Sequence, residues 1–385
     1  MDPSLSILNA LIKSEVCGEP LSLAPLSLEE AKAVYRLAKH HDLAHIAGNA
    51  LCRFGLLSDE KAKGAFEKEA HRALYYSAQR ERELAILSDL LAKEEIPFMP
   101  LKGAVLRTLY PTPWLRNSCD IDILIHEEHL SRAKDALLTE GYRLFSTGSH
   151  DIALDSPRGV HTELHFCLIE EQVLNGMDAP LKNPWASAIP SRDEPFRYEM
   201  SDALFYYYHI AHMAKHYLLG GCGVRPFLDL WLIRHRMEGD ESVRRAVLEN
   251  GGLLAFHDTA CILAEVWFGD ASHTPVSEEM EAHVLKGGVY GSTENRVRVQ
   301  QAKRGGKLRY ALARIFLSYD ALKFYYPVLQ KHKWLYPLYQ VKRWFRLAFF
   351  GAKHSLRELH MNQSLSAEES QKTLSHLEAL GFQLK

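Results

Sequence analysis

The sequence is poor in cysteine, and its six cysteines, at positions 17, 52, 119, 167, 222 and 261, lie at least 35 positions apart. This spacing excludes Cys-x-x-Cys zinc and redox motifs and predicts reduced thiols. A basic leader is also lacking, since the chain begins Met1-Asp2-Pro3-Ser4. No apolar run approaches the roughly 18 residues that would suggest a bilayer-spanning helix. We therefore expect a cytoplasmic protein without a membrane span.

The chain carries little net charge. Its 46 Lys and Arg residues oppose 48 Asp and Glu residues, which gives −2. The molecule as a whole therefore has no field that would attract nucleic acid or membranes, and any such affinity must be local. With 47% apolar residues, 24% charged residues and 385 positions, the composition predicts a folded protein of two or three structural units.

Helical and strand periodicities divide the chain into three parts. Apolar residues recur every three or four positions from Leu28 to Glu95, and Ser58-Asp59-Glu60 supplies an N-cap and an acidic first turn for the second helix of that part. Helical periodicity returns from residue 201 after a proline-rich connection. We expect helices at 201–219, 225–238, 253–268, 308–322, 335–350 and 366–380.

The middle part alternates between the two periodicities. Strands are predicted at 96–101, 119–125, 142–145, 152–154 and 160–168, and helices at 103–110 and 127–140. This pattern predicts an α+β fold. Its expected parts are an N-terminal helical region (1–95), a core (96–195) and a larger C-terminal helical domain (196–385).

The run Cys119 to Ile125 contains a candidate metal site. Asp120 and Asp122 lie two positions apart on a strand, so both project from one face with about 6.6 Å between their backbone positions. Carboxylates this close repel unless a cation lies between them, and Mg²⁺ prefers such oxygen ligands. Glu163, on a later alternating strand, is a candidate third acid. The alternative is that the two aspartates lie on the solvated face of an edge strand and bind no metal.

Several motifs occur together around these acids. Leu101-Lys102-Gly103 opens a helix directly after a strand, where backbone N–H groups can receive a phosphate. These residues, Leu109-Tyr110-Pro111 before Arg116, Asp120-Ile121-Asp122 and Glu163-Leu164-His165 resemble a bacterial family of uncharacterised nucleotidyltransferases in the polymerase-beta nucleotidyltransferase superfamily. Weaker similarity extends to Gly287-Gly288-Val289-Tyr290-Gly291 and to residues 326–343.

The resemblance implies a minimal nucleotidyltransferase fold, with a short mixed sheet that carries the acids. It implies that Asp120 and Asp122 bind two Mg²⁺ ions, with Mn²⁺ as a substitute, and that Glu163 completes the site and helps to activate the incoming hydroxyl. One departure is the pair Lys102-Gly103, where most of the superfamily has Gly-Ser or Gly-Gly. Lys102 would then replace the missing hydroxyl by its charge.

Other candidates have two interpretations each. Arg116 either forms a fork to phosphate oxygens or pairs with Glu127 or Glu128 in a loop. The histidines of the later strand, His161 and His165, either join Glu163 in a zinc site or form hydrogen bonds beside a magnesium site.

The 201–219 helix carries a face of histidines, His209, His212 and His216, with Lys215 beside them. This face either approaches the triphosphate or packs against the sheet. We include Lys215, with Lys102, Gly103 and Arg116, among the candidate nucleotide-binding residues.

The segment 296–357 is a basic exception to the neutral whole. It holds 15 Lys and Arg residues, one acid (Asp320) and 13 aromatic residues. Such a surface can contact a nucleic-acid backbone, an anionic polymer or a membrane face. It can equally be the solvated face of amphipathic helices, balanced by the acidic N-terminal half.

The leading hypothesis is a magnesium-dependent nucleotidyltransferase that binds ATP or another nucleoside triphosphate and moves the monophosphate to an acceptor hydroxyl, with release of pyrophosphate. The acceptor could be a small molecule, a protein side chain or an RNA end. One alternative is a D-x-D glycosyltransferase, disfavoured because about 95 helical residues precede the core. The other is a degenerate, non-catalytic nucleotide-binding protein.

Overall fold

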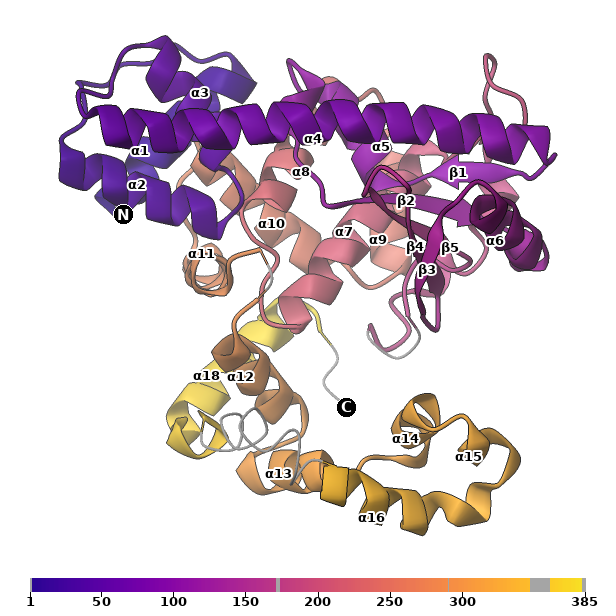
Figure 1. Ribbon diagram of the computed structural model, residues 1–385. Helices are drawn as coiled ribbons and strands as arrows, with labels where there is room; N and C mark the ends of the chain where they lie inside the picture. Colours follow the sequence, from indigo (N-terminus) through magenta and orange to yellow (C-terminus); the bar gives the residue numbers. More distant parts are fainter. Residues whose placement is uncertain (1, 171–173, 290, 347–360, 383–385) are drawn as a thin grey trace.

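A computed structural model describes residues 2–170, 174–289, 291–346 and 361–382 (Figure 1). It is mainly helical, with one small mixed sheet, and the predicted α+β class is confirmed. Within the described residues, no helix is both long enough and apolar enough to cross a membrane.

The N-terminal part consists of short helices and one long helix that packs against them. The elements are α1 (Pro3–Ile12), a π-helical turn (Lys13–Cys17), α2 (Leu28–His40), α3 (Ala44–Arg53) and α4 (Glu60–Lys93). The predicted cap is confirmed, because the Asp59 side chain accepts a hydrogen bond from the Ala62 amide at 2.8 Å. Helix α1 was not predicted. In Figure 1, α4 extends from the N-terminal helices to the sheet and so links the two.

The sheet has five strands in the order β1-β2-β5-β4-β3. They are β1 (Phe98–Pro100), β2 (Asp120–Ile125), β3 (Arg143–Thr147), β4 (Asp151–Asp155) and β5 (His161–His165). The β2–β5 pair is parallel and the others are antiparallel. The two short helices beside them are α5 (Lys102–Leu106) and α6 (Leu130–Thr139). All five predicted strands are therefore found.

The two faces of β2 differ because its residues alternate. Ile121, Ile123 and Ile125 belong to a core cluster with the C-terminal half of α4 and with α6. Asp120 and Asp122 point to the opposite face, where Leu124 belongs to a second, larger core with α7 and other helices. The period of two therefore places the acids on the side of the sheet that faces α7.

Among the other described residues, the regular structure is helical apart from a small β-hairpin in the proline-rich connection, β6 (Ile189–Pro190) and β7 (Tyr198–Glu199). The helices are α7 (Asp202–Leu218), α8 (Arg225–Arg236), α9 (Glu241–Asn250), α10 (Leu254–Phe268), α11 (Pro275–Gly287), α12 (Thr293–Lys303), α13 (Lys307–Ile315), α14 (Tyr319–Tyr325), α15 (Val328–Lys331), α16 (Tyr336–Arg346) and α18 (Ala367–Ala379). The larger core cluster contains residues from all three predicted parts of the chain.

The single helix predicted over 308–322 is wrong. Ser318 adopts an extended backbone conformation, and its hydroxyl accepts a hydrogen bond from the Ala321 amide at 3.2 Å, so it caps a new helix, α14. The sequence pattern missed α9, α11 and α12. The predicted helix 335–350 matches α16 as far as Arg346, and its last four positions lie outside the described residues.

Candidate functional site

The acids meet because β2 and β5 are parallel neighbours. In their register Asp122 is opposite Glu163, and Asp120 is opposite His161. Since side chains alternate along a strand, Asp120, Asp122, Glu163 and His165 share one face of the sheet. The pairing brings residues about 40 positions apart in sequence into one cluster.

The compact group of ligand atoms consists of Asp122, Glu163 and His165, whose ligand atoms all lie within 4.8 Å of one another. His165 Nε2 is 3.2 Å from Glu163 Oε2 and 3.5 Å from Asp122 Oδ1. Asp120 lines the same cavity but is not part of this group. The most compact group of possible ligands thus includes His165, and the predicted metal role of Asp120 stays a prediction.

The charges of the cluster are strongly coupled. Burial, and then the charge of Asp122, raise the pKa of Asp120 to about 6. Burial alone would also raise the pKa of Asp122, but His165 and Lys102 outweigh it and lower that pKa. Burial opposes the charge on His165, yet Asp122 and Glu163 raise its pKa to about 9. The cluster therefore stabilises positive charge at its centre.

Lys102 supplies a second positive charge. Its Nζ lies 3.9 Å from Asp122 Oδ2 and 5.2 Å from the centroid of the Tyr208 ring. Burial lowers the pKa of this ammonium, and the two aspartates oppose that effect. Lys102 is the first residue of α5, one position before the predicted start of this helix, and Gly103 also lines the cavity.

A cationic wall from α7 and α8 faces the acids across a cavity of about 340 Å³, which is within the usual size range of ligand pockets. Lys215 and Arg225 line it. Lys215 forms an ion pair with Glu170, and Arg225 donates to Asn117 O at 2.7 Å and to Asp42 Oδ2 at 3.2 Å. The predicted nucleotide-binding residues therefore line the same cavity as the acids.

The three histidines of α7 all line the cavity. His209 is buried, with Nε2 3.0 Å from Pro226 O. The Nε2 atoms of His212 and His216 are 3.0 Å apart. Burial, followed by the charge of Lys102, lowers the pKa of both, to about 4 for His216. Both imidazoles are therefore neutral at pH 7.

The interpretation of Arg116 needs a correction. Its Nε and Nη2 donate to Asp229 Oδ1 and Oδ2, both at 2.9 Å, and both side chains are buried. A pairing with Glu127 or Glu128 is excluded, since the six-residue strand β2, about 20 Å long, separates them. The guanidinium group of Arg116 thus binds the carboxylate of Asp229 on α8. Arg116 still lines the cavity, and its Nη1 is 3.6 Å from where a Cβ on Gly103 would lie.

A glycine turn closes the cavity beside α8. Gly221 has φ +149°, and a Cβ built there would lie 2.8 Å from the Cα of Gly287. The turn Gly220–Gly223 and the segment 287–289 are therefore in backbone contact, and Val289 reaches the cavity. The contact involves the glycine-rich stretch 287–291 noted in the sequence, of which Tyr290 lies outside the described residues.

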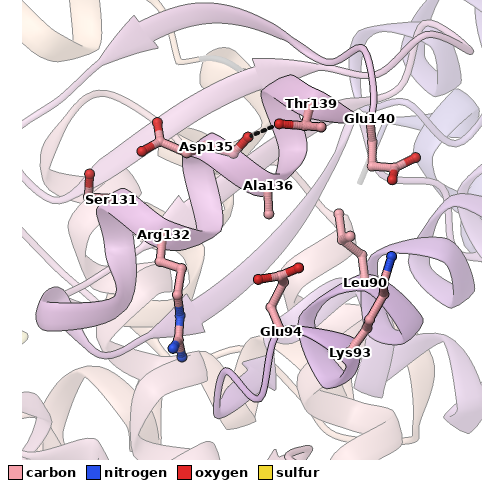
Figure 2. Close-up of a pocket in the computed structure, with 9 residues that line it drawn as sticks. All are labelled: Leu90, Lys93, Glu94, Ser131, Arg132, Asp135, Ala136, Thr139 and Glu140. Atoms are coloured by element: carbon pink, nitrogen blue, oxygen red, sulfur yellow. Dashed lines mark hydrogen bonds between the residues drawn. The ribbon is translucent and has the colours of Figure 1, made fainter.

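A larger hollow, of about 590 Å³, lies between α4 and α6 (Figure 2). Its lining includes exposed charges of both signs, among them Lys93, Arg132 and Asp135. The Thr139 hydroxyl donates to the Asp135 carbonyl, which is a bond within α6. The lining shares no residue with the acidic cavity. Because the clustered acids and the facing cations line only the acidic cavity of these two, we take that cavity as the candidate functional site.

Sequence reasoning left several residues of the cavity out of the candidate site. His165 was weighed only as a zinc ligand or a hydrogen-bonded neighbour, although its place two positions after Glu163 on an alternating strand indicated the same face. Asp229 and Arg225 follow the glycine turn in sequence, but no local pattern assigns their partners. Tyr208, on the buried side of α7, packs against Lys102.

The cluster suits a divalent cation. Asp122 Oδ1 and both ring nitrogens of His165 are buried and lack a hydrogen bond of ordinary geometry within the described residues. Two carboxylates and one imidazole form a mixed donor set, in which the carboxylate oxygens suit Mg²⁺ or Mn²⁺ and the imidazole nitrogen suits metals such as Zn²⁺. The orphaned atoms indicate a place where positive charge is stabilised, and a bound cation would replace the proton that the two carboxylates favour on His165.

Comparison with known families agrees with this geometry. Residues 27–269 match a family described as uncharacterised nucleotidyltransferase, and the chain belongs to that family. The matched range includes the whole sheet, α7, α8 and all the residues named above as lining the acidic cavity except Val289. No curated protein matches the chain.

Proposed function

We propose that the protein transfers a nucleoside monophosphate from a nucleoside triphosphate to an acceptor hydroxyl and releases pyrophosphate. The observation that carries this proposal is the single cavity in which Asp122, Glu163 and His165 face Lys102 and Lys215. A triphosphate needs such cations, and its metal needs such acids. Family membership supports nucleotidyl transfer in general.

In this proposal one group of cavity residues binds a metal ion and another group binds the phosphates. Asp122, Glu163 and His165 would hold a divalent ion, with Asp120 beside them at the start of β2. When bound, such an ion neutralises phosphate charge and lowers the pKa of the acceptor hydroxyl. Lys102 is proposed to bind phosphate oxygens.

We extend the proposal to the α7–α8 wall, where the cations Lys215 and Arg225 bind the outer phosphates. The acceptor oxygen forms a bond to the α-phosphorus while the bond to pyrophosphate breaks in line. Glu163 assists removal of the hydroxyl proton. Most of the catalysis is then positioning and charge stabilisation.

The test combines binding with turnover. We expect calorimetry to detect triphosphate binding only with Mg²⁺ or Mn²⁺, and labelled triphosphates in cell extract to add a nucleotide-sized mass to one component. Asp122→Asn should abolish both, whereas Glu163→Gln should retain more binding than turnover. Asp135→Asn, on the exposed face of α6, is the matched control and should leave both unchanged.

The other functions are distinguishable outcomes. Metal-dependent binding without pyrophosphate release across a broad acceptor panel would indicate a non-catalytic nucleotide-binding protein. Release of a nucleoside diphosphate from a nucleotide sugar would indicate a glycosyltransferase. Absence of any metal-dependent binding would refute the proposal.

A further inference from the structure

The segment 307–346, which we name the C-terminal arm, exposes an unusual amount of apolar surface. It comprises α13, α14, α15 and α16, and extends away from the sheet in Figure 1. Ten of its large apolar side chains are exposed: Leu308, Leu312, Ile315, Phe316, Tyr325, Val328, Trp334, Leu338, Val341 and Phe345. Exposed apolar side chains gathered on one element of a protein are typical of an interaction surface.

Helix α16 has an inner face and an outer face. On the inner face, Tyr336 Oη and Gln340 Nε2 donate to Leu317 O, and Trp344 Nε1 donates to Ile315 O at 2.7 Å. These bonds hold α16 against the segment after α13. The side chains of the inner face therefore already have partners within the arm.

The outer face of α16 carries Leu338, Val341 and Phe345, which are 62%, 41% and 63% exposed. Their spacing of three and four residues places them in one stripe along the helix. On α13, Leu308, Leu312 and Ile315 repeat this spacing and are also exposed. Each helix thus presents an apolar stripe that the arm itself does not cover.

Basic residues are interspersed with these apolar residues along the arm. Residues 307–346 contain nine Lys and Arg residues and one acid, Asp320. Lys342 Nζ lies 5.3 Å from the centroid of the Tyr339 ring, and Lys333 Nζ lies 4.9 Å from that of Tyr319. The arm therefore combines cations, tyrosine rings and aliphatic side chains on one exposed element.

We propose that the C-terminal arm binds the surface of an anionic phospholipid bilayer, without crossing it. The apolar stripes would enter the boundary between headgroups and acyl chains, and the Lys and Arg residues would contact lipid phosphates. This inference goes beyond the proposed catalytic function and does not depend on it. Trp334 is the most exposed of the ten apolar side chains, at 76%, and we expect this aromatic residue to enter the interface.

Charge and apolar character together favour a membrane over two other partners. Nucleic acid would engage the cations and rings, but it offers nothing to bury Leu338 or Val341. A symmetric pairing of two arms would bury the stripes, but it would bring nine cations of one copy against nine of the other. An anionic bilayer can bury the apolar stripes and also pair with the Lys and Arg residues.

The experiment is vesicle co-sedimentation of the full chain. We expect binding to vesicles of equal parts phosphatidylglycerol and phosphatidylcholine, at least tenfold stronger than to phosphatidylcholine alone. Trp334→Phe should remove a blue shift of tryptophan fluorescence that accompanies binding.

Leu338→Ser with Phe345→Ser should weaken binding to anionic vesicles roughly tenfold or more. The matched control is Leu144→Ser with Phe145→Ser on β3, where the side chains are 51% and 67% exposed, and it should bind like the wild type. Because all four side chains are exposed, neither pair should impair folding.

Three results would overturn the proposal. The first is no binding to anionic vesicles. The second is binding that the apolar variant leaves intact, together with salt-sensitive binding to single-stranded RNA, which would identify nucleic acid as the partner. The third is a concentration-dependent dimer that the apolar variant abolishes while no vesicles bind, which would identify a second copy.

Discussion

The buried pair of Arg116 and Asp229 allows a quantitative prediction. The two side chains are 8% and 2% exposed, and they share two charge-assisted hydrogen bonds of 2.9 Å. Tyr110 donates a third bond to Asp229 Oδ1, also at 2.9 Å. Arg116→Met keeps the volume but leaves the carboxylate with one of its three donors.

The expected cost is about 3–5 kcal/mol of unfolding free energy. Two hydrogen bonds to charged groups are worth roughly 1.5–3 kcal/mol each, and breaking a buried pair from one side has a similar cost. Replacing both partners, with Arg116→Met and Asp229→Leu, should cost clearly less than the sum of the single changes, because no charge is then left buried. Denaturant unfolding of the three variants measures these differences.

A matched pair on the surface provides the control. Arg245 also forms two hydrogen bonds with one carboxylate, that of Asp258, at 3.2 and 3.1 Å, but both side chains are largely exposed. Because water screens such a pair, Arg245→Met should unfold close to the wild type. A change of less than about 1 kcal/mol for Arg116→Met would refute the argument from burial.

The pair also has a predictable pH dependence. Burial opposes the charge on Asp229, but Arg116 outweighs it and lowers the pKa of that carboxyl. A lowered pKa means that the stabilisation is fully present above the ordinary Asp pKa of about 3.9 and is lost as the pH falls through the lower, folded value. The stability difference between the wild type and Arg116→Met should therefore shrink in strong acid.

Three further predictions concern the cavity. Lys102→Ala should weaken triphosphate binding with Mg²⁺ by roughly ten- to a hundredfold in calorimetry, while Lys134→Ala on α6 should not; equal affinities would remove Lys102 from the site. Asp120→Asn should preserve or raise the melting temperature at pH 7 without metal, because burial and a neighbouring carboxylate disfavour the charge on Asp120 and raise its pKa to about 6. A clear loss of stability would show that the charged Asp120 is not destabilising. Gly221→Ala should cost about 1–3 kcal/mol more than Gly18→Ala in unfolding experiments, since both residues have positive φ but only Gly221 closely approaches another backbone; similar losses would show that the approach is unimportant.

The sheet was predictable because its signals are local. Alternation in residues 119–125 distinguishes the isoleucines that enter the core from the aspartates that leave it, and the structure follows this pattern. Capping residues likewise fixed the start of α4. The break between α13 and α14 was missed because Ser318 interrupts an otherwise continuous apolar period, and one serine inside such a pattern is a weak signal.

The candidate site also has one part that local sequence signals predict and one part that they do not. Asp122, Glu163 and His165 come from two adjacent strands of one supersecondary unit, so a pattern read over about 40 residues nearly suffices to find them. The opposing cations have no such unit, because Lys215 and Arg225 come from helices that begin after the proline-rich connection. Helical periodicity shows which face of α7 is buried, but not what it is buried against.

Arg116 shows the consequence of this difference. Its carboxylate partner lies 113 positions further along the chain, whereas Glu127 and Glu128 are close in sequence but lie beyond the far end of β2. Sequence proximity therefore favoured a pairing that the rigid strand makes impossible. A motif defines the acids of such a site, but the cations that face them come together only when distant helices pack onto the polar face of the sheet. Mutations in the α7–α8 wall should accordingly affect triphosphate binding while leaving the acidic cluster assembled.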